Sequence, residues 1–382
     1  MRIGVVTKWF NRGQPVVGRQ TRSALDQLGH ETFVLARPKK ERGPQPGALS
    51  RDDVWDQPGV TEASAYDIPL GDYLEWIERE GIEAIFCDQN YGWDELAELR
   101  NRGVRVIGRF VWEHFEASHL EGARRAYDVV FSMTRAEQER YREMGLETPY
   151  VSWGCHPELI EAGARAAQVT QTSRVAPHRV KRGTFAEEES VTFVFPGGFL
   201  GRRKPLGPVL DAWSLVESRR ARLVVKSQVE RARLRDAVAA AKRDPRIDLR
   251  IGDEPTEQHL AAVAAADVTL SPARWEGLGL PLYEAVAFGQ PAITNDVAPM
   301  NEITRHEENG LLVASIPDGS VRSGIAAHAF DVGAMAAAID RLASDDELRL
   351  CLAAGARDLR DGERSWEHTV RGFEALLEMP VP

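Results

Sequence analysis

Short apolar runs rich in β-branched residues alternate along the chain with longer segments whose apolar residues recur at helical spacing. Residues 3–7 form the first run, a helical segment follows to about Leu28, and residues 31–35 form the second run. A strand buried in a parallel sheet is a continuous apolar run, whereas a helix carries one apolar stripe. The alternation therefore predicts a doubly wound α/β sheet.

The same alternation continues through most of the chain and starts afresh in its second half, which predicts two domains of one class. The first half carries expected strands at 84–88, 105–110, 129–133 and 150–152, and expected helices at 73–80, 93–101 and 135–144. The second half carries expected strands at 191–195, 222–226, 247–251 and 267–270, and expected helices at 205–217, 231–242, 256–265 with Thr256 as cap, 281–288, 332–342 and 346–359.

Two segments show neither the continuous apolar run of a buried strand nor the apolar spacing of a helix. Residues 38–66 are rich in proline, glycine and charge, which predicts a long mobile surface loop and a candidate lid. Residues 161–190 contain a basic cluster, and we interpret them as an interdomain linker. We therefore expect an N-terminal domain at residues 1–160, the linker at 161–190, a C-terminal domain at 191–364 and a terminal helix at 365–382.

One stretch, residues 271–313, concentrates candidate chemistry. Gly277 and Gly279 fall in the turn between the strand at 267–270 and the helix at 281–288. Backbone amides and the positive end of the helix dipole attract phosphate at such a turn. Glu276 lies in the loop and Glu284 in the helix, so two carboxylates could hold ribose and sugar hydroxyls around one diphosphate. A solvated face with a helix-start carboxylate is the alternative interpretation.

A second turn carries three consecutive cations. Arg202, Arg203 and Lys204 follow the strand at 191–195 and precede a helix. Cations at a helix start oppose the helix dipole, so three of them together indicate a bound anion. They are placed to neutralise a departing diphosphate.

Composition narrows the function classes. A net charge of −10 argues against general affinity for nucleic acid. The three cysteines form no disulfide or metal pattern, the chain enters a strand at once, and no apolar run could span a bilayer, so we expect a cytoplasmic protein without a signal peptide. Residues 1–51 are nevertheless basic, and this face could meet anionic lipid or a phosphorylated acceptor; a solvated basic surface is the alternative.

The stretch from Glu276 to Glu284, with its glycines, its proline and residues 309–313, resembles the donor site of family-4 retaining glycosyltransferases. The resemblance implies the GT-B architecture, in which two Rossmann-like domains face a cleft and a C-terminal helix crosses back to the N-terminal domain. It implies that Glu276 faces the donor sugar, that Glu284 holds the ribose, and that the loop amides of Gly277, Leu278, Gly279 and Leu280 meet the diphosphate.

The resemblance extends to three further segments of the chain. It implies that Arg203 and Lys204, with Arg202 beside them, contact the phosphates, and that Gly13 in the first loop approaches the diphosphate from the N-terminal domain. It also implies that His114, at the end of the strand at 105–110, faces the donor sugar. A plain turn at Gly13 and a structural histidine bonded to a carbonyl at His114 are the alternatives. The family often has a glycine pair where this chain has Gly13-Gln14, and glycines after the strand at 222–226, where this chain has Lys226-Ser-Gln228.

The implied reaction moves a hexosyl group from a nucleoside-diphosphate sugar to a hydroxyl of a glycan, lipid or small-molecule acceptor, with retention and without a metal or other cofactor. The first glycines do not form the dinucleotide motif GxGxxG, so no nicotinamide site is expected. A sugar-nucleotide epimerase or hydrolase, and a catalytically silent nucleotide-sugar-binding subunit, are the alternatives.

Overall fold

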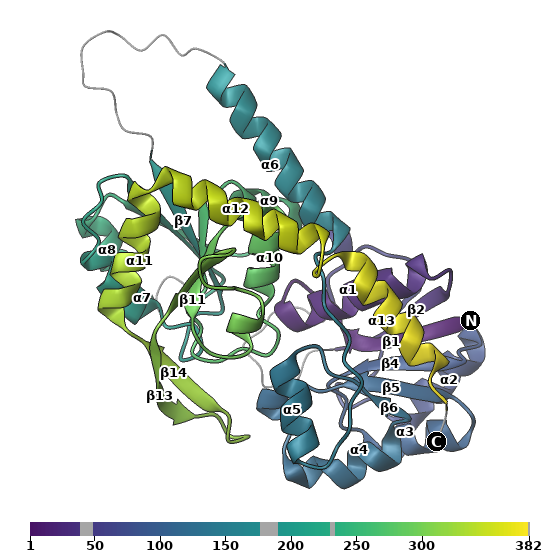
Figure 1. Cartoon of the computed structure of the whole chain (residues 1–382). Coiled ribbons are helices and arrows are strands. Elements are labelled where there is room, and N and C mark those ends of the chain that lie inside the picture. Colours follow the sequence, from purple (N-terminus) through teal and green to yellow (C-terminus); the bar gives the residue numbers. More distant parts are fainter. Residues whose placement is uncertain (39–48, 176–189, 230–233, 381–382) are drawn as a thin grey trace. The chain divides into compact units, whose positions relative to one another are not determined.

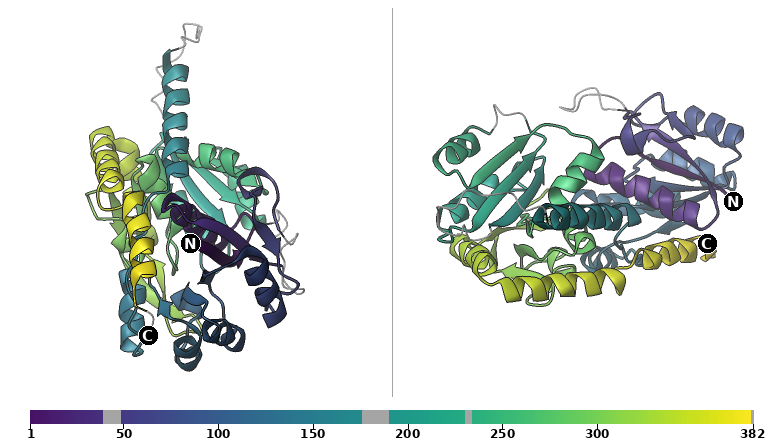
Figure 2. Two further views of the ribbon diagram at one scale, coloured as in Figure 1. Left: turned by 90° about the vertical axis from the view of Figure 1, so that its right-hand side faces the viewer. Right: turned by 90° about the horizontal axis from the view of Figure 1, so that it is seen from above.

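The computed structural model describes residues 1–38, 49–175, 190–229 and 234–380 of the chain. It divides into two compact units (Figures 1 and 2). Unit 1 comprises Met1–Trp153 with Trp366–Pro382, and unit 2 comprises Gly154–Ser365. The expected return of the C-terminal helix to the N-terminal domain is confirmed.

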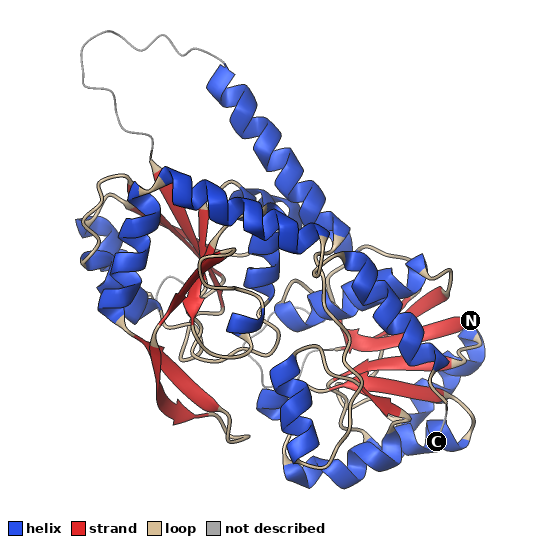
Figure 3. Cartoon of the chain, viewed as in Figure 1, coloured by secondary structure: helices blue, strands red, loops and turns tan. Residues whose placement is uncertain are grey.

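Unit 1 is built on a six-stranded parallel sheet of order β3-β2-β1-β4-β5-β6. Figure 3 shows the strands of both units in red and their helices in blue. Its strands are β1 Arg2–Lys8, β2 Glu31–Arg37, β3 Val60–Glu62, β4 Ala84–Asp88, β5 Arg105–Arg109 and β6 Val129–Val130. Its helices are α1 Gly13–Gln27, α2 Leu70–Glu80, α3 Trp93–Asn101, α4 Leu120–Ala126, α5 Arg135–Glu143 and α13 Trp366–Glu378, with short 3-10 helices at Asp53–Trp55, Trp112–His114 and Ala117–His119.

Helices cover both faces of this sheet, which is why its strands are continuous apolar runs rather than alternating ones. Gly4 in β1 lies under Trp76 of α2, where an added Cβ would be 2.2 Å from the ring. Thr7, of opposite parity in the same strand, lies under Gly18 of α1. α2 and α1 therefore pack on opposite faces.

Substituting Gly108 by alanine is expected to destabilise unit 1. An added Cβ would lie 2.2 Å from Cε1 of Tyr127 and 2.9 Å from the carbonyl oxygen of Cys87, so the core must shift. Overpacking of this kind costs roughly 1–3 kcal/mol. Denaturant unfolding measures the cost. Gly71→Ala is the matched control, since nothing lies within 4 Å of its added Cβ; equal midpoints for both variants would contradict the packing.

A buried glutamate makes the stability of unit 1 depend on pH. Glu137 Oε2 accepts the Met133 amide at 2.9 Å, and Oε1 accepts the Tyr141 hydroxyl at 3.3 Å. Burial raises the pKa of Glu137 to about 7, against the opposing charge of Arg109. The folded state therefore keeps a proton that the unfolded state loses above about pH 4.5, and stability falls as pH rises toward 7.

Glu137→Gln is expected to remove this slope, because an amide can accept from Met133 and donate to Tyr141 without ionising. The stability of the variant relative to wild type should increase by roughly 2–3 kcal/mol between pH 5 and pH 8. Denaturant unfolding at both pH values measures the difference. The same difference at the two pH values would show that Glu137 ionises in the folded state as it does in the unfolded chain.

Two expectations for unit 1 are corrected. Part of the expected mobile loop, residues 39–48, lies outside the described residues, but residues 49–66 contain a 3-10 helix and the edge strand β3. Trp55 is buried there, with its carbonyl oxygen accepting from Nε1 of Trp9 at 2.8 Å. Residues 150–152 form no strand and make only an isolated bridge from Tyr150 to Ser132.

Unit 2 repeats the architecture with a parallel sheet of order β12-β11-β10-β7-β8-β9 and a separate hairpin, β13–β14. Its strands are β7 Val191–Gly198, β8 Ala221–Ser227, β9 Ile247–Ile251, β10 Val268–Leu270, β11 Ala292–Asn295, β12 Gly310–Val313, β13 Ser315–Ser320 and β14 Ala326–Phe330. Its helices are α6 Pro157–Val175, α7 Leu206–Ser214, α8 Arg235–Arg243, α9 Thr256–Ala264, α10 Leu280–Phe288, α11 Val332–Ser344 and α12 Asp346–Asp361, with a 3-10 helix at Met300–Glu302.

Two expectations for unit 2 are also corrected, and one element is new. The segment expected to be a linker from residue 161 is helical as far as 175, within α6, and residues 176–189 lie outside the described chain. The hairpin β13–β14 was not expected from the sequence. Thr256 is the first residue of α9, and Pro255 occupies the cap position without a side-chain cap.

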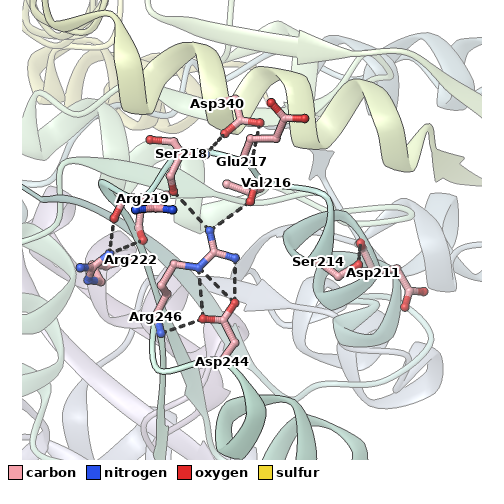
Figure 4. Close-up of polar contacts among 11 residues, drawn as sticks. Asp211, Ser214, Val216, Glu217, Ser218, Arg219, Arg222, Asp244, Arg246 and Asp340 are labelled. Atoms are coloured by element: carbon pink, nitrogen blue, oxygen red, sulfur yellow. Dashed lines mark hydrogen bonds and ion pairs between the residues drawn. The ribbon is translucent and has the colours of Figure 1, made fainter.

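At the amino edge of this sheet, polar groups bind one another (Figure 4). Arg246, just before β9, pairs with Asp244 and donates to the carbonyl oxygens of Val216 and Ser218 at 3.0 and 3.2 Å. Asp340 of α11 accepts the amides of Glu217 and Ser218 at 3.1 and 2.8 Å. This network fixes the turn between α7 and β8 and is structural.

Candidate functional site

The strand order of unit 2 places two charged loops together. The direction of chain progression reverses between β7 and β10, which are neighbours in the sheet. Residues 199–204 follow the carboxyl end of β7, and residues 271–279 follow that of β10. Open α/β sheets bind ligands at such a switch point. The Arg274 amide donates to the Arg203 carbonyl oxygen at 2.8 Å and joins the two loops directly.

The second loop is held by buried side chains at the end of β11. Thr294 Oγ1 donates to the Ser271 carbonyl oxygen at 2.7 Å, and Asn295 Nδ2 donates to the Ala273 carbonyl oxygen at 3.0 Å. Both side chains are buried. The loop therefore enters α10 in a defined conformation.

The start of α10 has the features of an anion site. Gly279, at the cap position, adopts a left-handed conformation with φ 79°, which favours glycine. No side chain caps the helix, and its first turn contains no acidic residue. Pro281 suits the first turn because it has no N–H to leave unsatisfied. The uncapped amides and the helix dipole leave positive potential at this point.

Three of the predicted charged residues lie together here. Arg203 Nη1 is 3.4 Å from Glu276 Oε2, and Glu276 is only 5% exposed. Lys204 Nζ donates to the Pro196 carbonyl oxygen at 3.2 Å. Burial lowers the pKa of Lys204, while the charges of Glu276 and Glu284 act to raise it. Arg202, by contrast, is exposed.

Glu284 lies on α10, half-buried. Burial raises its pKa, and the charges of His259 and Lys204 oppose the shift. None of the hydrogen bonds among the described residues is donated to its carboxylate. A partly buried carboxylate usually has donors, so this one is suited to a pair of ligand hydroxyl groups.

A second group of charged side chains, to which the sequence pattern assigned no role, lies beside this site. Lys226, at the end of β8 and 4% exposed, pairs with Glu254. His259 Nδ1 of α9 lies 3.1 Å from Glu254 Oε1, and this hydrogen bond is the main cause that lowers the pKa of Glu254 to about 2. Glu254 and His259 lie five positions apart, but Lys226 is distant from both in sequence, and the fold brings it to them.

The two remaining predicted site residues belong to unit 1. Gly13 is the first residue of α1, whose cap position is Arg12 without a side-chain cap. His114 ends a 3-10 helix after β5, and its side chain is 58% exposed, with Nε2 3.6 Å from Glu113 Oε1. The alternative of a buried structural histidine does not fit that exposure.

In the described ranges, no group of three or more His, Cys, Asp or Glu side chains is arranged to hold a metal ion. Nor does any helix there combine the length and apolar character needed to cross a membrane.

Comparisons with known proteins find glycosyltransferases. Residues 190–345, less than half of the chain, match the family described as Glycosyl transferases group 1. A D-inositol 3-phosphate glycosyltransferase of Jonesia denitrificans is 33% identical over 127 residues, 33% of this chain and 26% of that protein. The lipopolysaccharide core biosynthesis mannosyltransferase LpsB of Rhizobium meliloti is 42% identical over 53 residues, 13% of this chain and 15% of that protein. The matches thus span about a quarter or less of these relatives.

Solved structures resemble the whole chain. A sucrose-phosphate synthase of Thermosynechococcus elongatus has a TM-score of 0.70 at 17% identity and covers 98% of both chains. Anabaena Alr3699/HepE, solved with UDP and glucose, has a TM-score of 0.69 at 14% identity and covers 99% of this chain and 100% of its own. WaaG, a glycosyltransferase of lipopolysaccharide biosynthesis, has a TM-score of 0.58 at 16% identity, with both chains fully covered. The predicted GT-B fold is confirmed.

Proposed function

We propose that this protein is a family-4 glycosyltransferase that moves a hexosyl group from a nucleoside-diphosphate sugar to an acceptor hydroxyl with retention. The observation that carries the proposal is the switch point of unit 2. It joins an uncapped helix start, two cations and the carboxylate of Glu276 within one pair of loops, and the carboxylate of Glu284 lies in the helix that follows. The match of residues 190–345 to a glycosyltransferase family, and a structural neighbour bound to UDP and glucose, support it.

Each group in this site has a role in the proposal. The amides of residues 277–280 and the cations of Arg203 and Lys204 stabilise the leaving diphosphate, where negative charge grows in the transition state. Arg202 adds to this field from the surface. Glu284 accepts the ribose hydroxyls, and Glu276 accepts hydroxyls of the donor sugar. From unit 1, His114 binds the donor sugar and Gly13 the diphosphate.

The bond from the anomeric carbon to the phosphate oxygen breaks, and a bond to the acceptor oxygen forms on the same face. The acceptor's proton passes to the leaving phosphate oxygen. No cofactor takes part, and Arg203 and Lys204 supply the charge that a metal ion provides elsewhere. Unit 1 selects the acceptor, which is a glycan, a lipid or a small molecule.

Product analysis tests this reaction. The protein is incubated with α-linked nucleoside-diphosphate sugars and an acceptor panel, with and without EDTA, and the anomeric proton of the product is followed by NMR. We expect an α-linked product at equal rates in both samples. A β-linked product would contradict retention, loss of activity in EDTA would contradict metal independence, and nucleoside diphosphate released without transfer would indicate a hydrolase.

A further inference from the structure

Two cations lie side by side at the carboxyl edge of the sheet in unit 1. Lys8 ends β1, Arg37 ends β2, and the two are register partners in the parallel pair. Register partners share a face of the sheet. Glu62, the last residue of β3, pairs with Ala36, one position before Arg37, so its side chain belongs to the opposite face.

The acid at the end of the other neighbouring strand is also on the opposite face. Cys87 of β4 pairs with Val6 and therefore shares a face with Lys8, which places the next residue, Asp88, on the other side. Asp88 is paired there with Arg109 of β5, at 3.1 Å from its Nε. Neither of these strand-end carboxylates neutralises Lys8 and Arg37.

Arg37 is 3% exposed, and its partners among the described residues are all neutral. It donates to the Gln89 carbonyl oxygen at 2.9 Å and to Asn90 Oδ1 at 2.7 Å, and its Cζ lies 5.1 Å from the centre of the Tyr66 ring. No ion pair joins it to a described carboxylate. A buried charge usually has an opposite charge as partner.

Two other buried arginines of unit 1, Arg22 and Arg109, follow that rule. Arg22 is 7% exposed and has Asp26 at 3.9 Å, and Arg109 is 5% exposed and has Asp88. Arg37 differs from both because no described carboxylate pairs with it. An anion from outside the described chain would compensate its charge.

Lys8 supplies a second positive charge beside Arg37, and it is more exposed than Arg37. Its Nζ lies 5.6 Å from the centre of the same Tyr66 ring and donates to Gln14 Oε1 at 3.1 Å, and the side chain is half-buried. Two like charges at one ring repel each other, and a bound anion would relieve that repulsion. The site lies beside the point between β1 and β4 at which this sheet reverses its order, where ligands bind in this fold class.

We propose that Lys8, Arg37 and Tyr66 form a subsite for a phosphate group carried by the acceptor. Lys8 contacts the phosphate, Arg37 supplies charge from beneath it, and the Tyr66 ring packs against the body of the ligand. The assignment of the phosphate to an acceptor rests on the proposed function. The anion subsite itself rests only on the contacts and charges observed in unit 1.

Binding without any nucleotide tests the subsite. Thermal shifts of the full chain are measured with inorganic phosphate, with glucose 6-phosphate and with glucose, and sedimentation with phosphatidylglycerol and phosphatidylcholine vesicles separates a lipid headgroup from a soluble phosphate. We expect binding of inorganic phosphate and glucose 6-phosphate but not of glucose; if a lipid carries the phosphate, vesicles of anionic phosphatidylglycerol bind and those of zwitterionic phosphatidylcholine do not. Lys8→Gln should weaken this binding roughly ten- to hundredfold. Arg102→Gln, at the amino edge of the same sheet, is the charge-matched control. No phosphate binding, or equal losses in both variants, would overturn the proposal.

Transfer assays then separate acceptor from donor. Lys8→Gln is expected to lower kcat/KM for phosphorylated acceptors by the same factor and to leave the KM for the donor unchanged. Arg37→Gln should act in the same direction, and Lys8→Gln alone decides the result if the buried variant fails to fold. A raised donor KM would assign the cations to the donor diphosphate and overturn the proposal. If no acceptor is glycosylated but phosphate binding is lost in Lys8→Gln, the proposed function fails and the anion subsite stands.

Discussion

Replacing Lys204 by methionine is expected to lower kcat by roughly a hundred- to a thousandfold, the usual cost of removing one group that stabilises transition-state charge. The lysine is held at the end of β7 by the Pro196 carbonyl oxygen, beside the loop of Glu276. Methionine keeps the apolar stem and removes only the ammonium group, so stability should change little. Steady-state kinetics at saturating donor measures the effect.

A matched control for this variant is Lys242→Met, on the exposed side of α8 in the same unit. It removes one positive charge from unit 2 without touching the loops at residues 199–204 and 271–279. A kcat for Lys204→Met within twofold of the control would show that this lysine does not act on the leaving group.

The second large effect is expected on binding. Glu284→Ala should raise the dissociation constant of a nucleoside diphosphate roughly ten- to a hundredfold, because a carboxylate that accepts ribose hydroxyls contributes about 1.5–3 kcal/mol per hydrogen bond. Titration calorimetry measures the constant. Glu347→Ala, at the exposed start of α12, is the control for charge, and equal affinities in the two variants would remove Glu284 from the donor site.

The pH dependence of binding follows from the same residue. Burial raises the pKa of Glu284, so its carboxylate is protonated at a higher pH than that of an exposed glutamate. Because a neutral carboxyl group accepts hydroxyl donors less well, nucleotide affinity should fall as pH is lowered through this raised pKa. The fall should be absent in Glu284→Ala.

The regular elements could be predicted from sequence because parallel strands buried on both faces leave an unmistakable apolar run. β4 and α3 begin and end where the pattern predicted them. The turn at Gly279 was predictable as well, since glycine, proline and a following helix have local causes. Local chemistry of this kind needs no knowledge of distant residues.

The elements that were missed lack such local signals. Among the described side chains of α6, Leu159, Ala162 and Ala166 are buried, and the sequence of the helix shows no strong apolar stripe. β13 is exposed along nearly its whole length and contains Pro317 and Gly319, which are residues typical of a loop.

The loop residues of the candidate site could be predicted from the sequence because each lies between the end of a strand and the start of a helix. The pairing of Lys226 with Glu254 and the charges around Arg37 depend on which strands are neighbours and on register. A one-residue shift in register would move these side chains to the other face of the sheet. That information is in the fold and in no single segment of the chain.

The proposed function requires that the switch point of unit 2 bind a nucleoside diphosphate. The most direct test is a thermal-unfolding screen of the intact protein with uridine, guanosine, adenosine and thymidine diphosphates. A ligand present at about 100 times its dissociation constant adds about 2.7 kcal/mol of stability. We expect one of these nucleotides to raise the unfolding temperature of wild type and to leave that of Glu284→Ala unchanged. Unchanged unfolding of wild type with all four nucleotides would contradict it.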